Sequence, residues 1–177
     1  NYILNHPHPP SLIGFICNYE TSPRYVEFDK LKDLLEINKK QSKYVAVIVK
    51  DDSVTLDNIK DLPFDYYQLY GCSPDEVRKI KETYKKKIIT ALTIKNKDDV
   101  LKYKDYEKVS DIILFDGPGM AESIGFNHDL LNEVPGHISK MIAGNIKIED
   151  LPNFKNKDWI LDVSGSLESK RGVKDIN

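Results

Sequence analysis

Short apolar runs recur along the chain, and their spacing is the strongest indication of its fold. Most of the runs are continuous rather than alternating, which is typical of strands buried on both faces in a parallel sheet. We therefore predict seven strands. They cover residues 12–17 (LIGFIC), 44–49 (YVAVIV), 66–71 (YYQLYG), 87–94 (KIITALTI), 111–117 (DIILFDG), 140–146 (KMIAGNI) and 159–165 (WILDVSG).

Helices are predicted between these strands. The segment 73–87 begins with Ser73 as a helix N-cap and Pro74 in the first turn. Shorter helices are predicted over 126–134 and 147–151. In the segment 28–40 one side of the predicted helix collects five positions, which are Phe28, Leu31, Leu34, Leu35 and Asn38.

The alternation of strands and helices predicts an α/β fold with right-handed crossovers. The strands recur about every 25 residues, close to the ~30 residues per unit of a (β/α)8 TIM barrel. We expect one barrel domain over 1–177, and an open doubly wound sheet is the alternative. Residues 1–11 leave no room for an eighth strand. We therefore expect the chain to begin inside the first helix of the barrel, with strand one missing. The segment 172–177 is expected to open a final helix and then stop.

Composition excludes several function classes. The net charge of −2 gives no electrostatic footprint for nucleic acid or an anionic membrane. Lysines interleave with acids over 95–108, which indicates solvated helix faces. No run approaches a membrane span, and no signal peptide is visible. Cys17 and Cys72 form neither a disulfide framework nor a metal-ligand spacing, so a reducing cytoplasm is the simplest location. The four histidines are scattered, and no metal site is predicted.

In both α/β architectures the ligand binds at the carboxyl ends of the strands. Arg24, in a loop after the first run, is suited to clamp a carboxylate with two hydrogen bonds or is a surface residue. Gln68 and Tyr70 end the third run, and Tyr70 is expected to line the site. Asp116 ends the run ILFD. It is either a purely structural residue at the end of a strand or a catalytic group. Asp162 either accepts hydrogen bonds from sugar hydroxyls or caps a buried network.

Two turns of small residues follow the last two runs. They contain Gly144 with Asn145, and Ser164, Gly165 and Ser166. Small side chains let an anion approach backbone N–H groups, and late βα units are the usual phosphate site in a barrel. The alternative is that these residues only form tight βα turns.

Five blocks together resemble phosphoribosylanthranilate isomerase, a family of tryptophan biosynthesis, over nearly the whole chain. They are 14–26 (GFICNYETSPRYV), 67–71 (YQLYG), 113–117 (ILFDG), 141–146 (MIAGNI) and 162–175 (DVSGSLESKRGVKD). Tyr70 stands where the family usually has His, and Asn145 replaces a Gly. The family's Lys-x-Cys-Gly motif, whose cysteine is the general base, is absent, and neither Cys17 nor Cys72 matches it. The family's glycine-rich loop is eroded over 120–126 (MAESIGF).

The resemblance implies an Amadori rearrangement of N-(5-phosphoribosyl)anthranilate to 1-(2-carboxyphenylamino)-1-deoxyribulose 5-phosphate. It implies Asp116 as the general acid and Arg24 as the group that holds the anthranilate carboxylate. It implies Gln68, Tyr70 and Asp162 as substrate-binding residues, and no cofactor. We expect a monomer or a weak homodimer.

Two other interpretations stay open. One is a non-catalytic or decayed barrel that binds a phosphosugar, which the missing base strand and the altered loop favour. The other is a different phosphate-binding barrel isomerase, although the His and Asp ligands of a metal-dependent epimerase are not visible.

Overall fold

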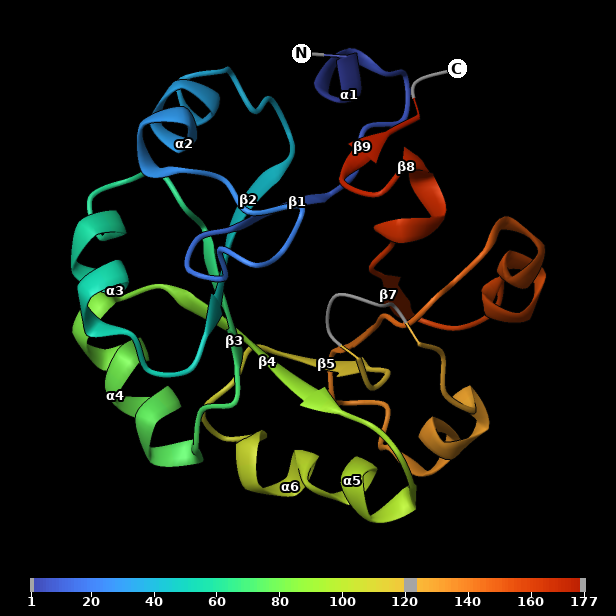
Figure 1. The fold of residues 1–177 in the computed structure, drawn as a ribbon. Helices are drawn as coiled ribbons and strands as arrows, with labels where there is room; N and C mark the ends of the chain where they lie inside the picture. Colours follow the sequence, from blue (N-terminus) through green and yellow to red (C-terminus); the bar gives the residue numbers. More distant parts are fainter. Residues whose placement is uncertain (1, 120–123, 176–177) are drawn as a thin grey trace. The chain divides into compact units, whose positions relative to one another are not determined.

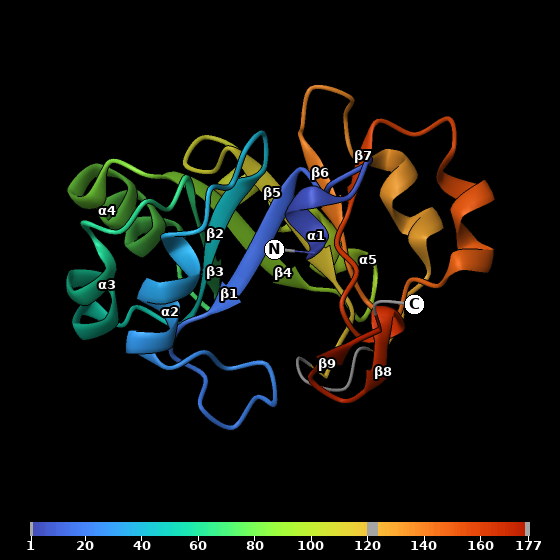
Figure 2. The same ribbon diagram turned by 90° about the horizontal axis from the view of Figure 1, so that it is seen from above.

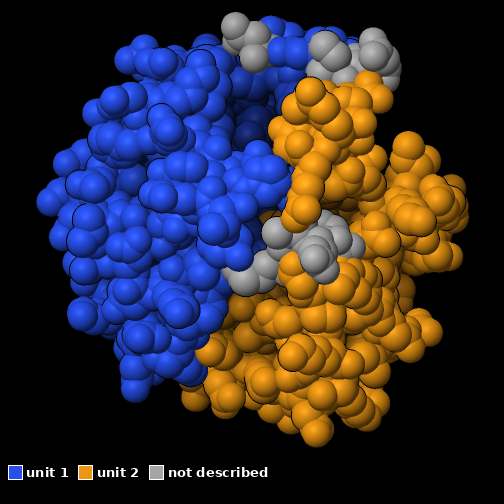
Figure 3. Space-filling model, in the orientation of Figure 1, with its two compact units in different colours: residues 1–88, 176 blue, residues 89–175, 177 orange. Residues whose placement is uncertain are grey.

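The computed structural model describes residues 2–119 and 124–175 of the 177-residue chain. The chain divides into two compact units, residues 1–88 with 176 and residues 89–175 with 177 (Figure 3). The boundary falls inside strand β4 (Lys87–Thr93). Each unit has its own strands, helices and buried side chains.

Unit 1 is built on three parallel strands in chain order. They are β1 (Leu12–Ile16), β2 (Lys43–Val49) and β3 (Tyr66–Tyr70). Its helices are α1 (Tyr2–Asn5), α2 (Phe28–Leu35), α3 (Ser53–Ile59) and α4 (Pro74–Tyr84). Helices α2, α3 and α4 lie along one face of the three strands (Figures 1 and 2).

Unit 2 continues the same pattern. After β4 come three more parallel strands, β5 (Ile112–Asp116), β6 (Lys140–Ile142) and β7 (Trp159–Leu161). Among the described residues of this unit, the helical segments are α5 (Lys97–Leu101), α6 (Tyr103–Tyr106) and the 3-10 helices η2 (His128–Glu133), η3 (Ile148–Phe154) and η4 (Gly165–Leu167). An antiparallel pair, β8 (Glu168–Lys170) and β9 (Val173–Lys174), follows.

A strand is confirmed in each of the seven predicted runs, because continuous apolar runs fit strands whose two faces are both covered. The last two are shorter than predicted and end at Ile142 and Leu161. Helix α4 is also confirmed, with Ser73 as its N-cap, and the structure adds a capping box. The Ser73 hydroxyl accepts a hydrogen bond from the Glu76 N–H, and the Glu76 carboxylate accepts one from the Ser73 N–H.

The structure corrects three details of the predicted helices. Helix α2 ends at Leu35, and Asn38 lies in the following turn, where its side-chain oxygen accepts a hydrogen bond from the Lys40 N–H. The two short segments in unit 2 are 3-10 helices, and η3 contains Pro152, which has no N–H to donate. Residues 173–174 form β9 rather than opening a helix, and residues 176–177 lie outside the described residues.

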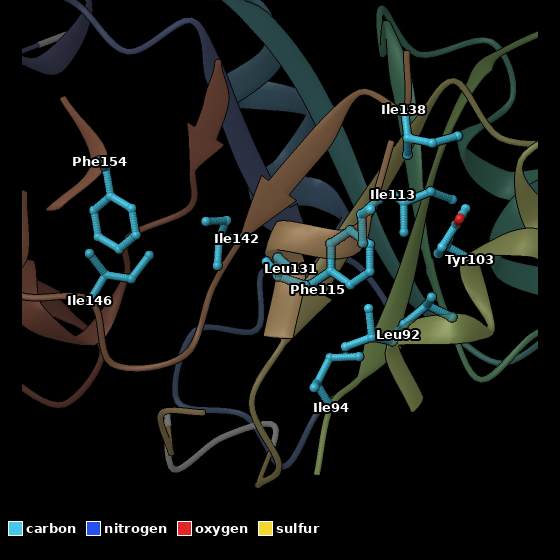
Figure 4. Close-up of a cluster of buried hydrophobic side chains, with 12 residues drawn as sticks. Leu92, Ile94, Tyr103, Ile113, Phe115, Leu131, Ile138, Ile142, Ile146 and Phe154 are labelled. Atoms are coloured by element: carbon cyan, nitrogen blue, oxygen red, sulfur yellow. The ribbon is translucent and has the colours of Figure 1, made fainter. Parts of the chain in front are cut away.

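The core of unit 2 shows which way its strands face. Ile113 and Phe115 of β5 pack among helical side chains such as Tyr103 and Leu131 (Figure 4). Ile142 of β6 belongs to the same buried cluster. Because side chains alternate along a strand, the residue after Phe115 faces away from the helices. That residue is Asp116.

Candidate active site

The predicted site residues fall in both units. Arg24, Gln68 and Tyr70 belong to unit 1. Asp116, Asp162 and the two small-residue turns belong to unit 2.

In unit 1 the structure brings Gln68 and Tyr70 together. The Gln68 Nε2 donates a hydrogen bond to the Tyr70 hydroxyl at 3.3 Å. Gln68 pairs in register with Val47, and its neighbour Tyr67 contacts Tyr84 of α4, so Gln68 faces away from the helices. Its side chain is buried although it is polar. The Gln68 amide and the Tyr70 phenol thus lie together on the side of the strands that faces away from the helices.

Arg24 lies in a loop that leaves the sheet after β1 and returns to it. Val26 N–H donates to the Ile16 carbonyl at 3.1 Å, which closes the loop at its far end. Inside the loop, the buried Ser22 hydroxyl accepts a hydrogen bond from the Arg24 N–H at 3.2 Å. The backbone of Arg24 is therefore fixed beside the carboxyl end of β1.

Asn18 anchors the near end of this loop. The sequence pattern did not single out this residue. Its side chain both donates to the Val49 carbonyl at 3.0 Å and accepts from the Val49 N–H at 2.9 Å. It also donates to Asp52, the N-cap of α3, at 3.0 Å. The Asn18 amide thus replaces the backbone where β1 ends. Hydrogen bonds from the Thr55 hydroxyl, the Asn18 side chain and the Thr55 N–H lower the pKa of the Asp52 carboxyl.

In unit 2, Asp116 and Asp162 belong to one row of residues. Phe115 pairs with Ile142, and Ile142 pairs with Leu161. One residue further, Ala143 N–H donates to the Phe115 carbonyl at 3.0 Å and Asp162 N–H donates to the Ile142 carbonyl at 2.8 Å. The row therefore runs Asp116, Ala143, Asp162 across β5, β6 and β7. Both carboxylates are half-buried, and the position between them carries only a methyl group.

The turn after β6 needs glycine. Gly144 has φ +96°, and a Cβ there would lie 2.9 Å from the Ile124 carbonyl oxygen and 3.0 Å from the Gly117 nitrogen. Asn145 follows at φ +54°, a left-handed conformation that Asn tolerates better than most residues. This explains how Asn145 can stand where the related family has Gly. Of the altered loop 120–126, residues 120–123 lie outside the described residues.

The turn after β7 is held by side chains. Lys174 Nζ donates to the Ser164 carbonyl at 2.7 Å and to Glu168 at 3.0 Å. Sequence reasoning missed both charged residues, although they lie in the block 162–175 that carries the family resemblance.

The two cysteines are thiols in ordinary structural positions. Burial raises the pKa of both Cys17 and Cys72 to about 12. Thiolates are the reactive form of cysteine, so neither residue suits a base or a nucleophile. Within the described part of the chain, no three His, Cys, Asp or Glu residues are grouped to hold a metal ion. In the same part, no helix is long and apolar enough to cross a membrane.

Solved structures with a similar architecture give the fold class. A phosphoribosylanthranilate isomerase from Thermotoga maritima matches with a TM-score of 0.82 at 21% identity, over 94% of this chain and 83% of that one. A phosphoribosylanthranilate isomerase in complex with reduced 1-(o-carboxyphenylamino)-1-deoxyribulose 5-phosphate matches with a TM-score of 0.80 at 21% identity, over 94% and 82%. The fold is thus an α/β fold of the TIM-barrel type with seven parallel strands.

Sequence comparison gives the family. The family model for N-(5'-phosphoribosyl)anthranilate isomerase matches residues 11–177. The isomerase of Rhizobium leguminosarum bv. trifolii is 33% identical over 176 residues, covering 93% of this chain and 78% of the relative. That of Agrobacterium fabrum is 32% identical over 178 residues, covering 94% and 80%. The chain belongs to the N-(5'-phosphoribosyl)anthranilate isomerase family, an isomerase family of tryptophan biosynthesis, as the sequence blocks predicted.

Proposed function

We propose that the chain converts N-(5'-phosphoribosyl)anthranilate to 1-(2-carboxyphenylamino)-1-deoxyribulose 5-phosphate, with the residues of the two units in separate roles. Family membership over residues 11–177 is the observation that carries the reaction. The roles of individual residues rest on their placement at the carboxyl ends of the strands, where barrels bind their ligands.

Asp116 is the general acid. It donates a proton to the ribose ring oxygen while the C1–O bond breaks and the nitrogen lone pair forms an iminium ion. A base then removes the C2 proton, and the resulting enolamine tautomerises to the ketone, so the reaction is an isomerisation with no atom gained or lost. The half-buried position of Asp116, in a row that faces away from the helices, supports this role. The base is neither Cys17 nor Cys72, because both thiols have a pKa of about 12.

Arg24 holds the anthranilate carboxylate. A guanidinium group binds a carboxylate through two parallel charge-assisted hydrogen bonds. The hydrogen bond from the Arg24 N–H to Ser22 and the loop closure at Val26 support this role by fixing where the side chain starts. Gln68, Tyr70 and Asp162 contact the substrate by hydrogen bonding.

The turns that contain Gly144 with Asn145, and Ser164, Gly165 and Ser166, bind the phosphate. Their position after the adjacent strands β6 and β7 supports this, because backbone N–H groups of small residues are accessible to an anion. A cytoplasmic location and a monomer or weak homodimer are part of the proposal. The free thiol of the buried Cys72 supports a reducing location.

The test is a turnover assay with N-(5'-phosphoribosyl)anthranilate, in which the product is identified by mass and by its retention against the authentic ketose. We expect product formation without any added cofactor. Binding of substrate without product would favour the alternative, a phosphosugar-binding barrel that has lost catalysis. The altered segment 120–126 is the sequence feature that favours that alternative.

A further inference from the structure

The β8–β9 pair is joined to the turn after β7 by a small network of charges. Glu168 and Lys174 face each other in the antiparallel register, and their side chains form an ion pair at 3.0 Å. The Glu168 side chain is only 5% exposed, whereas that of Lys174 is 38% exposed. A buried carboxylate needs partners, and Glu168 has a second one in the Gly172 N–H at 3.0 Å.

The Lys174 ammonium group reaches beyond the ion pair. It donates to the Ser164 carbonyl at 2.7 Å, and the Leu167 N–H donates to the same oxygen at 3.3 Å. The Asp175 N–H, next to Lys174, donates to the Leu167 carbonyl at 2.8 Å. Two donors on one oxygen fix the direction of the Ser164 carbonyl.

The direction of that carbonyl decides the direction of the next N–H. A peptide unit is planar and trans, so its C=O and N–H bonds point in opposite directions. When Lys174 draws the Ser164 oxygen toward itself, the Gly165 N–H is turned away from Lys174. Gly165 has no side chain to cover this N–H.

We propose that Lys174, itself held by Glu168, is a positioning residue that presents the Gly165 N–H to the phosphate group of the substrate. This inference rests on the proposed phosphate turn at residues 164–166. It assigns to the two-stranded β8–β9 sheet a role in binding a phosphate monoester. Lys174 acts through the backbone and does not itself touch the substrate.

The probe is inorganic phosphate, titrated into the protein while backbone amide resonances are followed by NMR. Lys174→Met should weaken phosphate binding about tenfold. This is the size expected when one charge-assisted hydrogen bond, here that from the Gly165 N–H to the phosphate, is lost. The Gly165 amide should show the largest loss of phosphate-induced shift. Lys170→Met is the matched control, because it removes the same charge from the same pair of strands at an exposed position with register partner Val173. It should leave the affinity nearly unchanged.

A second variant separates positioning from plain stabilisation of the fold. Glu168→Gln keeps the shape of the side chain but removes the charge that holds Lys174, so it should weaken phosphate binding less than Lys174→Met. Because Glu168 acts through Lys174, the double variant should bind phosphate as Lys174→Met does. Additive losses would overturn the proposal, and so would an unchanged affinity in folded Lys174→Met or Glu168→Gln.

Gly165→Val tests the underlying phosphate turn on its own. If this variant keeps full affinity for inorganic phosphate, the proposed turn itself is wrong. If Gly165→Val loses affinity while Lys174→Met and Glu168→Gln keep it, the turn stands and only the role of Lys174 is wrong.

Discussion

The carboxyl ends of the strands are built differently in the two units. In unit 1 polar side chains form the hydrogen bonds at these strand ends. Asn18 replaces a stretch of backbone, Ser22 holds Arg24, and Gln68 contacts Tyr70. In unit 2 the turns after β6 and β7 are proposed to bind phosphate through backbone N–H groups, and the first of them is packed so closely that a Cβ at Gly144 would lie 2.9 Å from the Ile124 carbonyl oxygen.

This difference predicts which kind of substitution should affect each unit. A binding group that is a side chain can be removed without disturbing the fold, so its loss appears in substrate affinity. A binding group that is a backbone turn cannot be removed, and only added bulk or a changed peptide direction disturbs it. The polar side chains of unit 1 should therefore be sensitive to truncation, and the two turns of unit 2 to enlargement.

The largest effect is expected for Gly144→Val in unit 2. The new side chain would force a β-branched residue to φ +96° and bring its Cβ within 3.0 Å of two backbone atoms. The free energy of unfolding, measured in urea, should fall by roughly 3 kcal/mol or more. Gly136→Val is the matched control, because a Cβ at Gly136 meets no atom within 4 Å. Equal losses in both variants would contradict the claim that the turn after β6 is limited by space.

Arg24→Ala should show the opposite behaviour in unit 1. Loss of a charge-assisted contact that is equal in ground and transition states should raise KM roughly 10- to 100-fold with kcat nearly kept. The hydrogen bond from the backbone N–H of residue 24 to Ser22 should stay in place. Arg78→Ala, which removes an exposed arginine of α4 paired with Asp75, is the control and should leave KM unchanged. A loss confined to kcat would mean that Arg24 does not simply hold the carboxylate.

Two buried tyrosines of unit 1 should respond in opposite directions to loss of their hydroxyl groups. Among the described residues, the Tyr67 hydroxyl is buried without a hydrogen-bond partner, whereas the Tyr44 hydroxyl donates to the Ile37 carbonyl at 3.0 Å. Tyr67→Phe should raise the free energy of unfolding by about 1 kcal/mol, and Tyr44→Phe should lower it by about 1 kcal/mol. Thermal unfolding of the two variants measures both changes in the free energy of unfolding. Destabilisation by Tyr67→Phe would show that the Tyr67 hydroxyl has a partner.

The smallest effect is a pH dependence in unit 2. His128 packs against Phe126 and Phe154, and its Nε2 is buried without a partner among the described residues. Burial lowers the pKa of His128, and this outweighs the opposing charges of Asp150 and Asp129. The unfolded chain therefore binds the proton more tightly, so stability should be complete above about pH 6.5 and fall as the pH drops below it. His128→Gln should flatten this dependence, and an unchanged pH profile in that variant would contradict the assignment.

The sequence was sufficient for the elements whose signal is local. Continuous apolar runs predicted the strands, and Ser73 with Pro74 predicted the start of α4. The block 162–175 predicted the family because its residues are contiguous. Each of these depends on neighbours in the chain, so no tertiary information was needed.

The parts that failed depend on contacts and pairing that the spacing of residue types does not reveal. Asn18 gains its role only because Val49 and Asp52 lie beside it, and its separation from them in the sequence exceeds 30 residues. Residues 173–174 have a helix-compatible pattern, but pairing with β8 and the bond from Lys174 to Ser164 make them a strand. The distinction between 3-10 and α-helix in η2 and η3 is set by packing as well as by Pro152, and residue spacing alone does not reveal it.

The central claim, that Asp116 is the acid of an isomerase, is tested most directly by steady-state kinetics of Asp116→Asn on N-(5'-phosphoribosyl)anthranilate. The amide keeps the shape of the side chain but cannot donate a carboxylic proton. We expect kcat to fall by ~10²–10⁴-fold with KM largely kept. Asp162→Asn, in the same row of unit 2, should act mainly on KM, because that carboxylate is assigned to binding. An Asp116→Asn variant that turns over near the wild-type rate would contradict the assignment of Asp116 as the general acid. Asp116 would then have only a structural role at the end of β5.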